Sequence, residues 1–110
     1  MKLTGEQIPE HLRHPKLHTV FTGGCIERGE GSRFRAKAHA HCRKGDPYQG
    51  TICFLSHKRL MQRKLGLHEL AHIIGECGHT DKFRAICKEL GVSIQAGQGL
   101  KSYEKRTRTV

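Results

Sequence analysis

Residues 68–79 read His68-Glu69-Leu70-Ala71-His72-Ile73-Ile74-Gly75-Glu76-Cys77-Gly78-His79, and this stretch predicts a helix that carries a metal site. Residues four apart lie on one face of an α-helix, so His68 and His72 can offer two imidazole nitrogens to one cation. The arrangement is H-E-x-x-H, in which the two histidines hold zinc and the glutamate, here Glu69, activates a zinc-bound water.

Apolar residues surround these side chains and predict that the helix is buried. They are Leu67, Leu70, Ala71, Ile73 and Ile74. A buried imidazole or carboxylate is costly unless it has a partner, and a metal ion is such a partner. The alternative is a core helix whose histidines bind no metal, but the apolar setting favours zinc.

Glycines after the helix allow a third ligand. Gly75 and Gly78 interrupt the helical pattern, so His79 can turn back toward the two helical histidines. Three protein ligands leave the fourth position of a zinc ion open, which is typical of a catalytic site. If His79 does not bind, the other candidates for the third ligand are Glu76, Cys77 and Asp81.

The composition predicts one small, basic domain. Of the 110 residues, 35% are hydrophobic and none is tryptophan, so the core is small and bound metal would add to its stability. The 20 Lys and Arg outnumber the 10 Asp and Glu, a net charge of +10 that favours a nucleic acid or a nucleic-acid-bound protein as partner. We expect a monomer with a domain over residues 1–95 and a basic, flexible tail over residues 96–110.

The cysteines predict a reduced, cytoplasmic chain. Five is an odd number, and no apolar run resembles a signal peptide or a membrane span, so we expect no membrane contact. No C-x-x-C pair is present, so the spacing of a zinc ribbon is missing. We interpret Cys25, Cys53 and Cys87 as small core residues rather than as ligands.

Short strands are predicted before the motif. Residues 19–22 and 25–28 form two candidates on either side of a Gly-Gly turn. Residues 34–41 alternate between Phe or Ala on one face and Arg, Lys or His on the other, so this strand has a small face on which a helix can pack closely. Together with residues 51–55 it suggests a hairpin. The outward histidines, which we expect to be solvated, are His39 and His41.

Two helices are predicted after the hairpin. Ser56 can cap a helix over residues 57–74, and Thr80 can cap a second helix over residues 81–90. Gly66, inside the first helix, costs about 1 kcal/mol relative to Ala and indicates that another element approaches closely. The start of that helix is basic, which opposes the helix dipole and favours an anion-binding role. Its basic residues are Lys58, Arg59, Arg63 and Lys64.

The order of elements and two short motifs resemble a minimal zincin-type metallopeptidase. Gly66-Leu67-His68-Glu69-Leu70-Ala71-His72, followed by Gly78-His79-Thr80-Asp81-Lys82-Phe83, is similar to the SprT-like group and to the related Spartan, WLM and YgjP-like families. Those families place a histidine just before a helix with an aromatic residue, which Phe83 matches. A metzincin has its third histidine one position earlier, so the spacing disfavours that class.

The resemblance covers about residues 51–90 and implies an α+β fold, with a small antiparallel sheet packed on the active-site helix and a C-terminal helix after it. It also implies a zinc metalloendopeptidase, in which His68, His72 and His79 bind Zn²⁺ and Glu69 is the general base. Residues 51–55, if they form the edge strand, could bind a peptide by strand addition. Candidates for stabilising the oxyanion are Tyr48, His57 and Tyr103.

The substrate follows from the same resemblance. The family includes proteases that act on DNA–protein crosslinks, and the chain is basic, so we expect DNA-associated proteins as substrates. Two other functions fit these residues. One is a non-proteolytic, zinc-stabilised nucleic-acid-binding module, and the other is a zinc hydrolase that acts on a non-peptide substrate.

Overall fold

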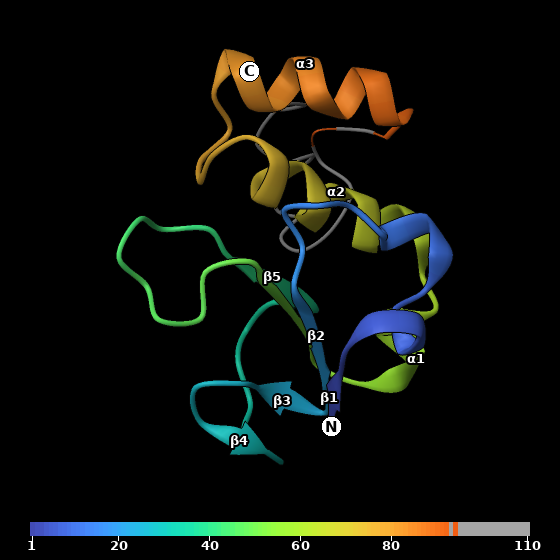
Figure 1. The fold of residues 1–110 in the computed structure, drawn as a ribbon, viewed down its shortest axis with the longest axis vertical. Helices are drawn as coiled ribbons and strands as arrows, with labels where there is room; N and C mark the ends of the chain where they lie inside the picture. The colour runs from blue at the N-terminus through green and yellow to red at the C-terminus, as the bar shows by residue number, and fades with distance from the viewer. Residues whose placement is uncertain (93, 95–110) are drawn as a thin grey trace, which may run out of the picture.

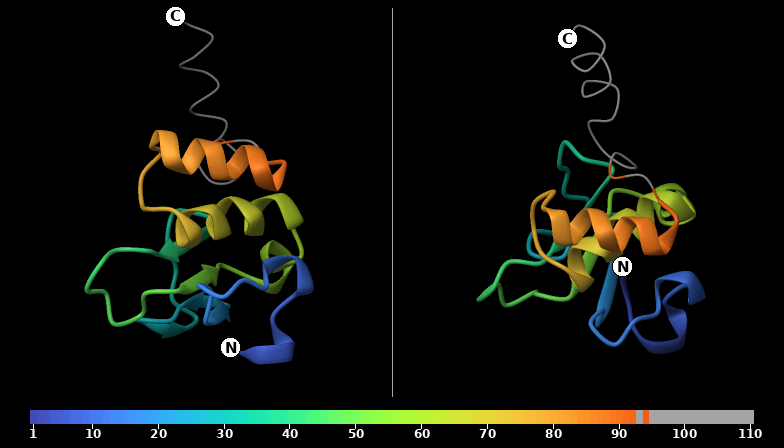
Figure 2. Two further views of the ribbon diagram at one scale, coloured as in Figure 1. Left: turned by 45° about the horizontal axis from the view of Figure 1, so that its top comes forward. Right: turned by 90° about the horizontal axis from the view of Figure 1, so that it is seen from above.

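One four-stranded sheet carries the fold, and the helices α2 and α3 stack in layers above it (Figure 1, Figure 2). The computed structural model describes residues 1–92 and residue 94. The strand order is β1-β2-β6-β5, with β1 at Lys2–Leu3, β2 at Thr19–Thr22, β6 at Thr51–Phe54 and β5 at Ala38–His41. The predicted basic tail, residues 96–110, lies outside the described residues.

The sheet is mixed, so the prediction of an antiparallel sheet is wrong in part. β6 pairs antiparallel with β5 but parallel with β2. Parallel neighbours need a long connection, and residues 23–50 supply it by leaving β2, forming β5 and returning as β6 between the two. The α+β class is confirmed.

A second, two-stranded sheet interrupts this connection. It consists of β3 at Gly24–Cys25 and β4 at Gly29–Glu30. The predicted strand over residues 25–28 is therefore wrong beyond its first residue. The backbone N–H of Arg28 donates to the carbonyl of Cys25 at 3.0 Å, which closes a tight turn instead.

The predicted hairpin of β5 and β6 is confirmed, but β5 is shorter than residues 34–41. Its buried Ala38 belongs to the main core together with Leu70 of the helix above, as the small face of this strand predicts. β5 lies at the edge of the sheet and β6 is internal. The expectation that residues 51–55 are the exposed edge strand is therefore wrong.

The predicted helix over residues 57–74 is two helices, α1 at His57–Leu60 and α2 at Arg63–Ile74. Leu60 and Leu65 are both buried, yet residues five apart point about 140° apart on one continuous helix. The break between the helices lets both side chains face the core. Ser56 caps α1 as predicted, because its hydroxyl accepts from the backbone N–H of Arg59 at 3.4 Å.

The remaining helices are α3 at Asp81–Leu90 and two short 3₁₀ turns, η1 at Gly5–Gln7 and η2 at Glu10–Leu12. Leu12 of η2 explains the glycine inside α2, because a Cβ on Gly66 would lie 3.0 Å from Leu12 Cδ2. Within the described residues, no helix is both long and apolar enough to cross a membrane.

Candidate metal centres

Three histidines converge between α2 and α3. His68 and His72 come from successive turns of α2, and His79 comes from the loop before α3. One candidate ligand atom of each lies within 4.8 Å of the others, so this group, the His triad, could hold a metal ion. The structure thus brings together all three residues that the sequence predicts as ligands.

Two glycines explain how His79 reaches the helix. Gly75 ends α2, and a Cβ at that position would lie 2.7 Å from Ile86 Cδ1, so any other residue would force the side chain of Ile86 on α3 to move. Gly78 has φ +87°, a conformation that L side chains rarely adopt, and it reverses the chain. Thr80 then caps α3 by accepting from the backbone N–H of Phe83 at 3.3 Å.

His72 is oriented by a backbone group. Its Nδ1 lies 3.1 Å from the carbonyl oxygen of Glu76, which can only accept, so Nδ1 carries the proton and Nε2 keeps a free lone pair. Burial lowers the pKa of His72 despite this hydrogen bond, which favours the neutral imidazole that metals bind.

Phe83 packs against the whole His triad. Its ring stacks on His72 at 4.0 Å between centroids and on His79 at 4.9 Å, and it meets His68 edge-on at 5.2 Å. The side chain is fully buried. The aromatic residue that the sequence motif indicates therefore holds the three imidazoles in place.

Glu69 follows His68 on α2 and is buried, with 3% of its surface exposed. Its Oε2 has no hydrogen-bond partner among the described residues, and burial raises the pKa of the carboxyl to about 8. A buried carboxylate with an unpaired oxygen is costly, and a nearby cation would lower that cost. The site therefore fits a bound metal ion.

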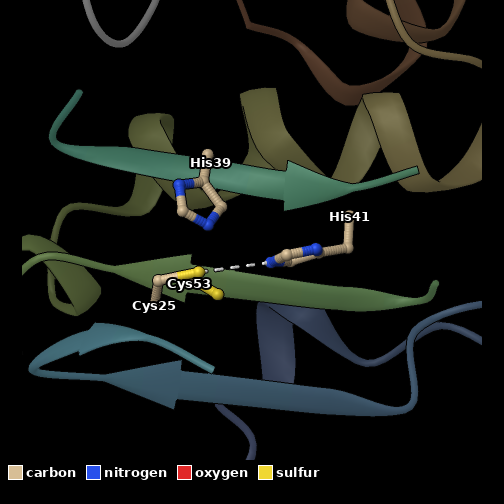
Figure 3. A group of neighbouring side chains, drawn as sticks. All are labelled: Cys25, His39, His41 and Cys53. Atoms are coloured by element: carbon tan, nitrogen blue, oxygen red, sulfur yellow. Dashed lines mark hydrogen bonds between the residues drawn. The ribbon is translucent and has the colours of Figure 1, made fainter. Parts of the chain in front are cut away.

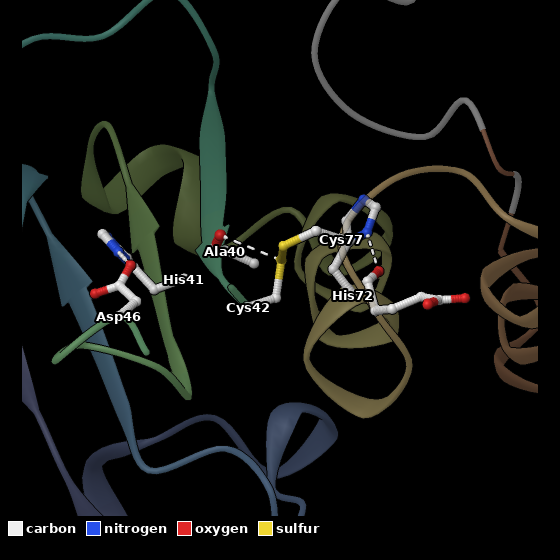
Figure 4. The surroundings of a disulfide bond; sticks show 7 residues. Ala40, His41, Cys42, Asp46, His72 and Cys77 are labelled. Atoms are coloured by element: carbon white, nitrogen blue, oxygen red, sulfur yellow. Dashed lines mark hydrogen bonds and ion pairs between the residues drawn. A yellow bond between two sulfur atoms is a disulfide. The ribbon is translucent and has the colours of Figure 1, made fainter. Parts of the chain in front are cut away.

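Two of the three alternative ligands are engaged elsewhere. Cys77 is bonded to Cys42 in a disulfide whose Cα atoms are 5.6 Å apart, so it cannot offer a thiolate (Figure 4). The side chain of Glu76 accepts from the hydroxyl of Thr80 at 2.7 Å. Asp81 is exposed in the first turn of α3.

This disulfide also corrects the expectation of a fully reduced chain. It joins the residue after β5 to the loop after α2, two elements that the sequence does not show to be neighbours. The other three cysteines, Cys25, Cys53 and Cys87, are free and buried, as expected of core residues. Cys25 and Cys53 nevertheless lie in a group that could hold a metal ion, so the expectation that they are not ligands does not follow from their burial.

The proposed oxyanion-stabilising residues lie elsewhere or are not described. Tyr48 packs against His41, with ring centroids 5.9 Å apart. His57 is exposed at the first position of α1, and Tyr103 lies outside the described residues.

A second group that could hold a metal ion contains Cys25, His39, His41 and Cys53. We refer to it as the Cys/His tetrad (Figure 3). Its candidate ligand atoms also lie within 4.8 Å of one another. The interpretation of His39 and His41 as solvated is wrong, because both are partly buried and their rings face the two cysteines.

Burial shapes the acid–base properties of the tetrad. It lowers the pKa of His39 to about 4, with help from His41 and Arg28, and it raises the pKa of the Cys53 thiol to about 12. The sequence signal for this group was the spacing of two histidines on one strand face with a cysteine on the next strand. That spacing indicates a common site only once the pairing of His39 with Cys53 in the β5–β6 register is known.

A pocket of about 380 Å³ lies near the end of β5. It is lined by Pro15, Lys16, His18, His41, Cys42, Gln49, Gly50, Ile73 and Gly75. None of the His triad residues lines it, so this pocket is not the site of the triad itself.

Comparisons of the chain with models of protein families, with curated proteins and with solved structures give no match.

Proposed function

We propose that the protein is a zinc-dependent metalloendopeptidase of the SprT-like type. The His triad would hold the metal and Glu69 would act as general base. The observation that carries the proposal is the convergence of three imidazoles. Glu69, the residue after His68 on the same helix, adds a buried carboxyl group with an unpaired oxygen. Three ligands leave one position of a tetrahedral zinc ion open, as catalysis requires.

The chemistry follows from the donor set. When bound, zinc supplies a Lewis acid that lowers the pKa of water from about 15.7 to near 7 and polarises a carbonyl. Glu69 takes the proton of the attacking water at its unpaired Oε2 and passes it to the leaving amine. Phe83 and the carbonyl of Glu76 keep the imidazoles oriented during these steps.

The edge strand β5 is the element that we propose for binding the substrate peptide. The backbone N–H of Leu55 donates to the carbonyl of Lys37 at 3.0 Å. Backbone groups alternate in direction along a strand, so those of His39 and His41 also point toward β6. The backbone groups of Ala38 and Ala40 therefore point away from β6, toward the open edge. An extended peptide could pair with these outward groups. β5 packs directly against α2, which carries Glu69.

The substrate class rests on charge. The net charge of +10 and the exposed cations at the helix starts, Lys58, Arg63 and Lys64, favour proteins that are bound to DNA. The proposal keeps the cytoplasmic location and the monomeric state that we expect from the sequence.

Glu69→Gln tests the proposal. The zinc-loaded wild type should cleave an unfolded protein such as casein, with or without added single-stranded DNA, and Glu69→Gln should abolish cleavage while keeping the zinc of the His triad. Glu76→Gln is the matched control, since its amide oxygen can still accept from Thr80 and cleavage should persist.

Other outcomes point to the other functions. Equal cleavage by wild type and Glu69→Gln would show that the mechanism is wrong. Salt-sensitive DNA binding without hydrolysis of any protein would favour the zinc-stabilised nucleic-acid-binding module. Hydrolysis of small amides alone, lost in Glu69→Gln, would favour a non-peptide hydrolase.

A further inference from the structure

The Cys/His tetrad lies on the face of the sheet opposite α2. Ala38 packs into the core beneath α2, and successive side chains of a strand point to opposite faces, so His39 and His41 point away from that helix. Cys53 lies directly across from His39 in the β5–β6 register. Cys25 reaches the group from β3, in a separate small cluster of buried residues with Phe21 and Cys53.

The four side chains come from three separate segments and point toward one another (Figure 3). His41 Nε2 lies 3.8 Å from the sulfur of Cys25. The two cysteines are free rather than joined in a disulfide. Two thiols and two imidazoles with a common centre match the donor set that zinc prefers in a four-coordinate site.

His41 is held in the tautomer that such a site needs. Its Nδ1 lies 2.9 Å from Asp46 Oδ2, so the carboxylate accepts the Nδ1 proton and Nε2 faces the cysteines with its lone pair. Asp46 is itself fixed, because its Oδ1 accepts from the backbone N–H of Tyr48 at 2.8 Å. A carboxylate behind a ligating histidine is the usual support for an imidazole that binds zinc.

The other histidine of the tetrad, His39, has a ring nitrogen without a hydrogen bond to the described residues. His39 Nε2 is buried and has no hydrogen-bond partner among the described residues. Leaving such a nitrogen unpaired is costly, and a metal ion at the centre of the tetrad would remove that cost. Phe34 covers the ring of His39 at 4.2 Å between centroids and keeps it turned toward the cysteines.

We propose that Cys25, His39, His41 and Cys53 form a structural zinc centre that is separate from the His triad. All four ligands come from the protein, so no position stays open for water or substrate and the centre is not catalytic. Zinc displaces the thiol protons of both cysteines on binding, and the two thiolates neutralise its charge.

The centre gives a small part of the fold its stability. The strands β3 and β4 have two residues each, and a hairpin of that size is not stable by itself. Among the residues that the structure describes, the buried cluster beside it consists of Phe21 and the two cysteines of the tetrad, with Ile26 and Phe34 packed against it. A metal ion bound by Cys25, Cys53 and β5 would fix this hairpin to the main sheet.

Cobalt substitution distinguishes the two centres without any activity assay. Thiolate ligands give cobalt(II) an intense charge-transfer absorption in the near ultraviolet, and the His triad has no sulfur ligand. The wild type, stripped of metal under native conditions and titrated with Co²⁺, should bind two ions, one of which produces this absorption. Zinc-edge X-ray absorption of the zinc-loaded wild type should show sulfur neighbours at about 2.3 Å.

Four variants assign the signal. Cys53→Ser should lose at least half of the thiolate absorption and bind the tetrad metal ion more weakly. Cys87→Ser, the matched control at a buried free cysteine outside the tetrad, should keep the full absorption and both metal ions. His72→Ala should lose one ion but keep the absorption. Asp46→Asn should weaken binding at the tetrad by about 10- to 100-fold.

The wild-type titration decides the proposal even if Cys53→Ser fails to fold. One bound ion without thiolate absorption would overturn it, as would a Cys25–Cys53 disulfide in protein isolated without oxidant. Absorption of undiminished intensity in a folded Cys53→Ser variant would do the same. None of these readouts depends on Glu69 or on cleavage, so they test the structural zinc centre independently of the proposed peptidase activity.

Discussion

Breaking the Cys42–Cys77 disulfide should lower the free energy of unfolding by roughly 4 kcal/mol. The bond closes a loop with a sequence separation of 35 residues. In the chain-entropy description, a loop of that length restricts the unfolded chain by about 3.8 kcal/mol at 25 °C. Cys77 is exposed and Cys42 is only partly buried, so replacing both by serine removes little packing and the loss reflects the bond itself.

Thermal unfolding of Cys42→Ser/Cys77→Ser should show the effect. For a domain of this size, 4 kcal/mol corresponds to roughly 15–30 °C in the melting temperature. The measurement should be made with and without bound metal, because ligands that bind the folded state raise the melting temperature independently. A phosphine reductant should lower the melting temperature of the wild type by a similar amount.

The double serine variant is its own control for the reductant, since it has no bond to reduce and its melting temperature should not move. The reasoning is refuted if the melting temperature of the variant lies within a few degrees of that of the wild type. It is also refuted if Cys42 and Cys77 of the wild type react with a thiol reagent before any reductant is added.

Two further predictions concern the loop and the ring that position the His triad. Gly78→Ala and Gly91→Ala both place a methyl group at a positive φ, +87° and +73°, and each should cost about 1–2 kcal/mol of stability. In competition with a chelator, only Gly78→Ala should also bind zinc more weakly than the wild type. Equal zinc affinities of the two variants would contradict this prediction. Phe83→Leu removes stacking worth about 0.5–1.5 kcal/mol per ring pair and should weaken zinc binding at the His triad roughly tenfold or more. The matched control is Phe34→Leu, which should leave that site unchanged, and a loss at the triad in Phe34→Leu would argue against the assignment.

The parts of the His triad that the sequence predicts are those fixed by neighbouring residues. The four-residue spacing of His68 and His72 needs only a helix, and the caps at Ser56 and Thr80 depend on the three residues that follow them. The return of His79 depends on the glycine break between it and α2. Each of these features is set within about twelve residues, where local rules are strong.

What the sequence does not predict depends on contacts between distant segments. The tetrad forms only because Cys53 pairs with His39 and because β3 folds across the sheet, and neither the register nor that placement can be read from spacing. The same holds for the parallel pairing of β2 with β6 and for the disulfide across 35 residues. A one-residue shift in register would have turned both histidines of β5 into the core.

The strand β5 joins all of these features, which gives its short sequence an unusual number of constraints. Ala38 must be small because α2 packs on it, and that packing sets where Glu69 and the His triad lie relative to the sheet edge. On the opposite face the same strand supplies two ligands of the tetrad. The next residue, Cys42, is bonded to the loop that carries His79. Metal at the tetrad would therefore hold in place the edge on which we propose that substrate binds, so loss of that metal should reduce peptide cleavage even though no tetrad residue takes part in the chemistry.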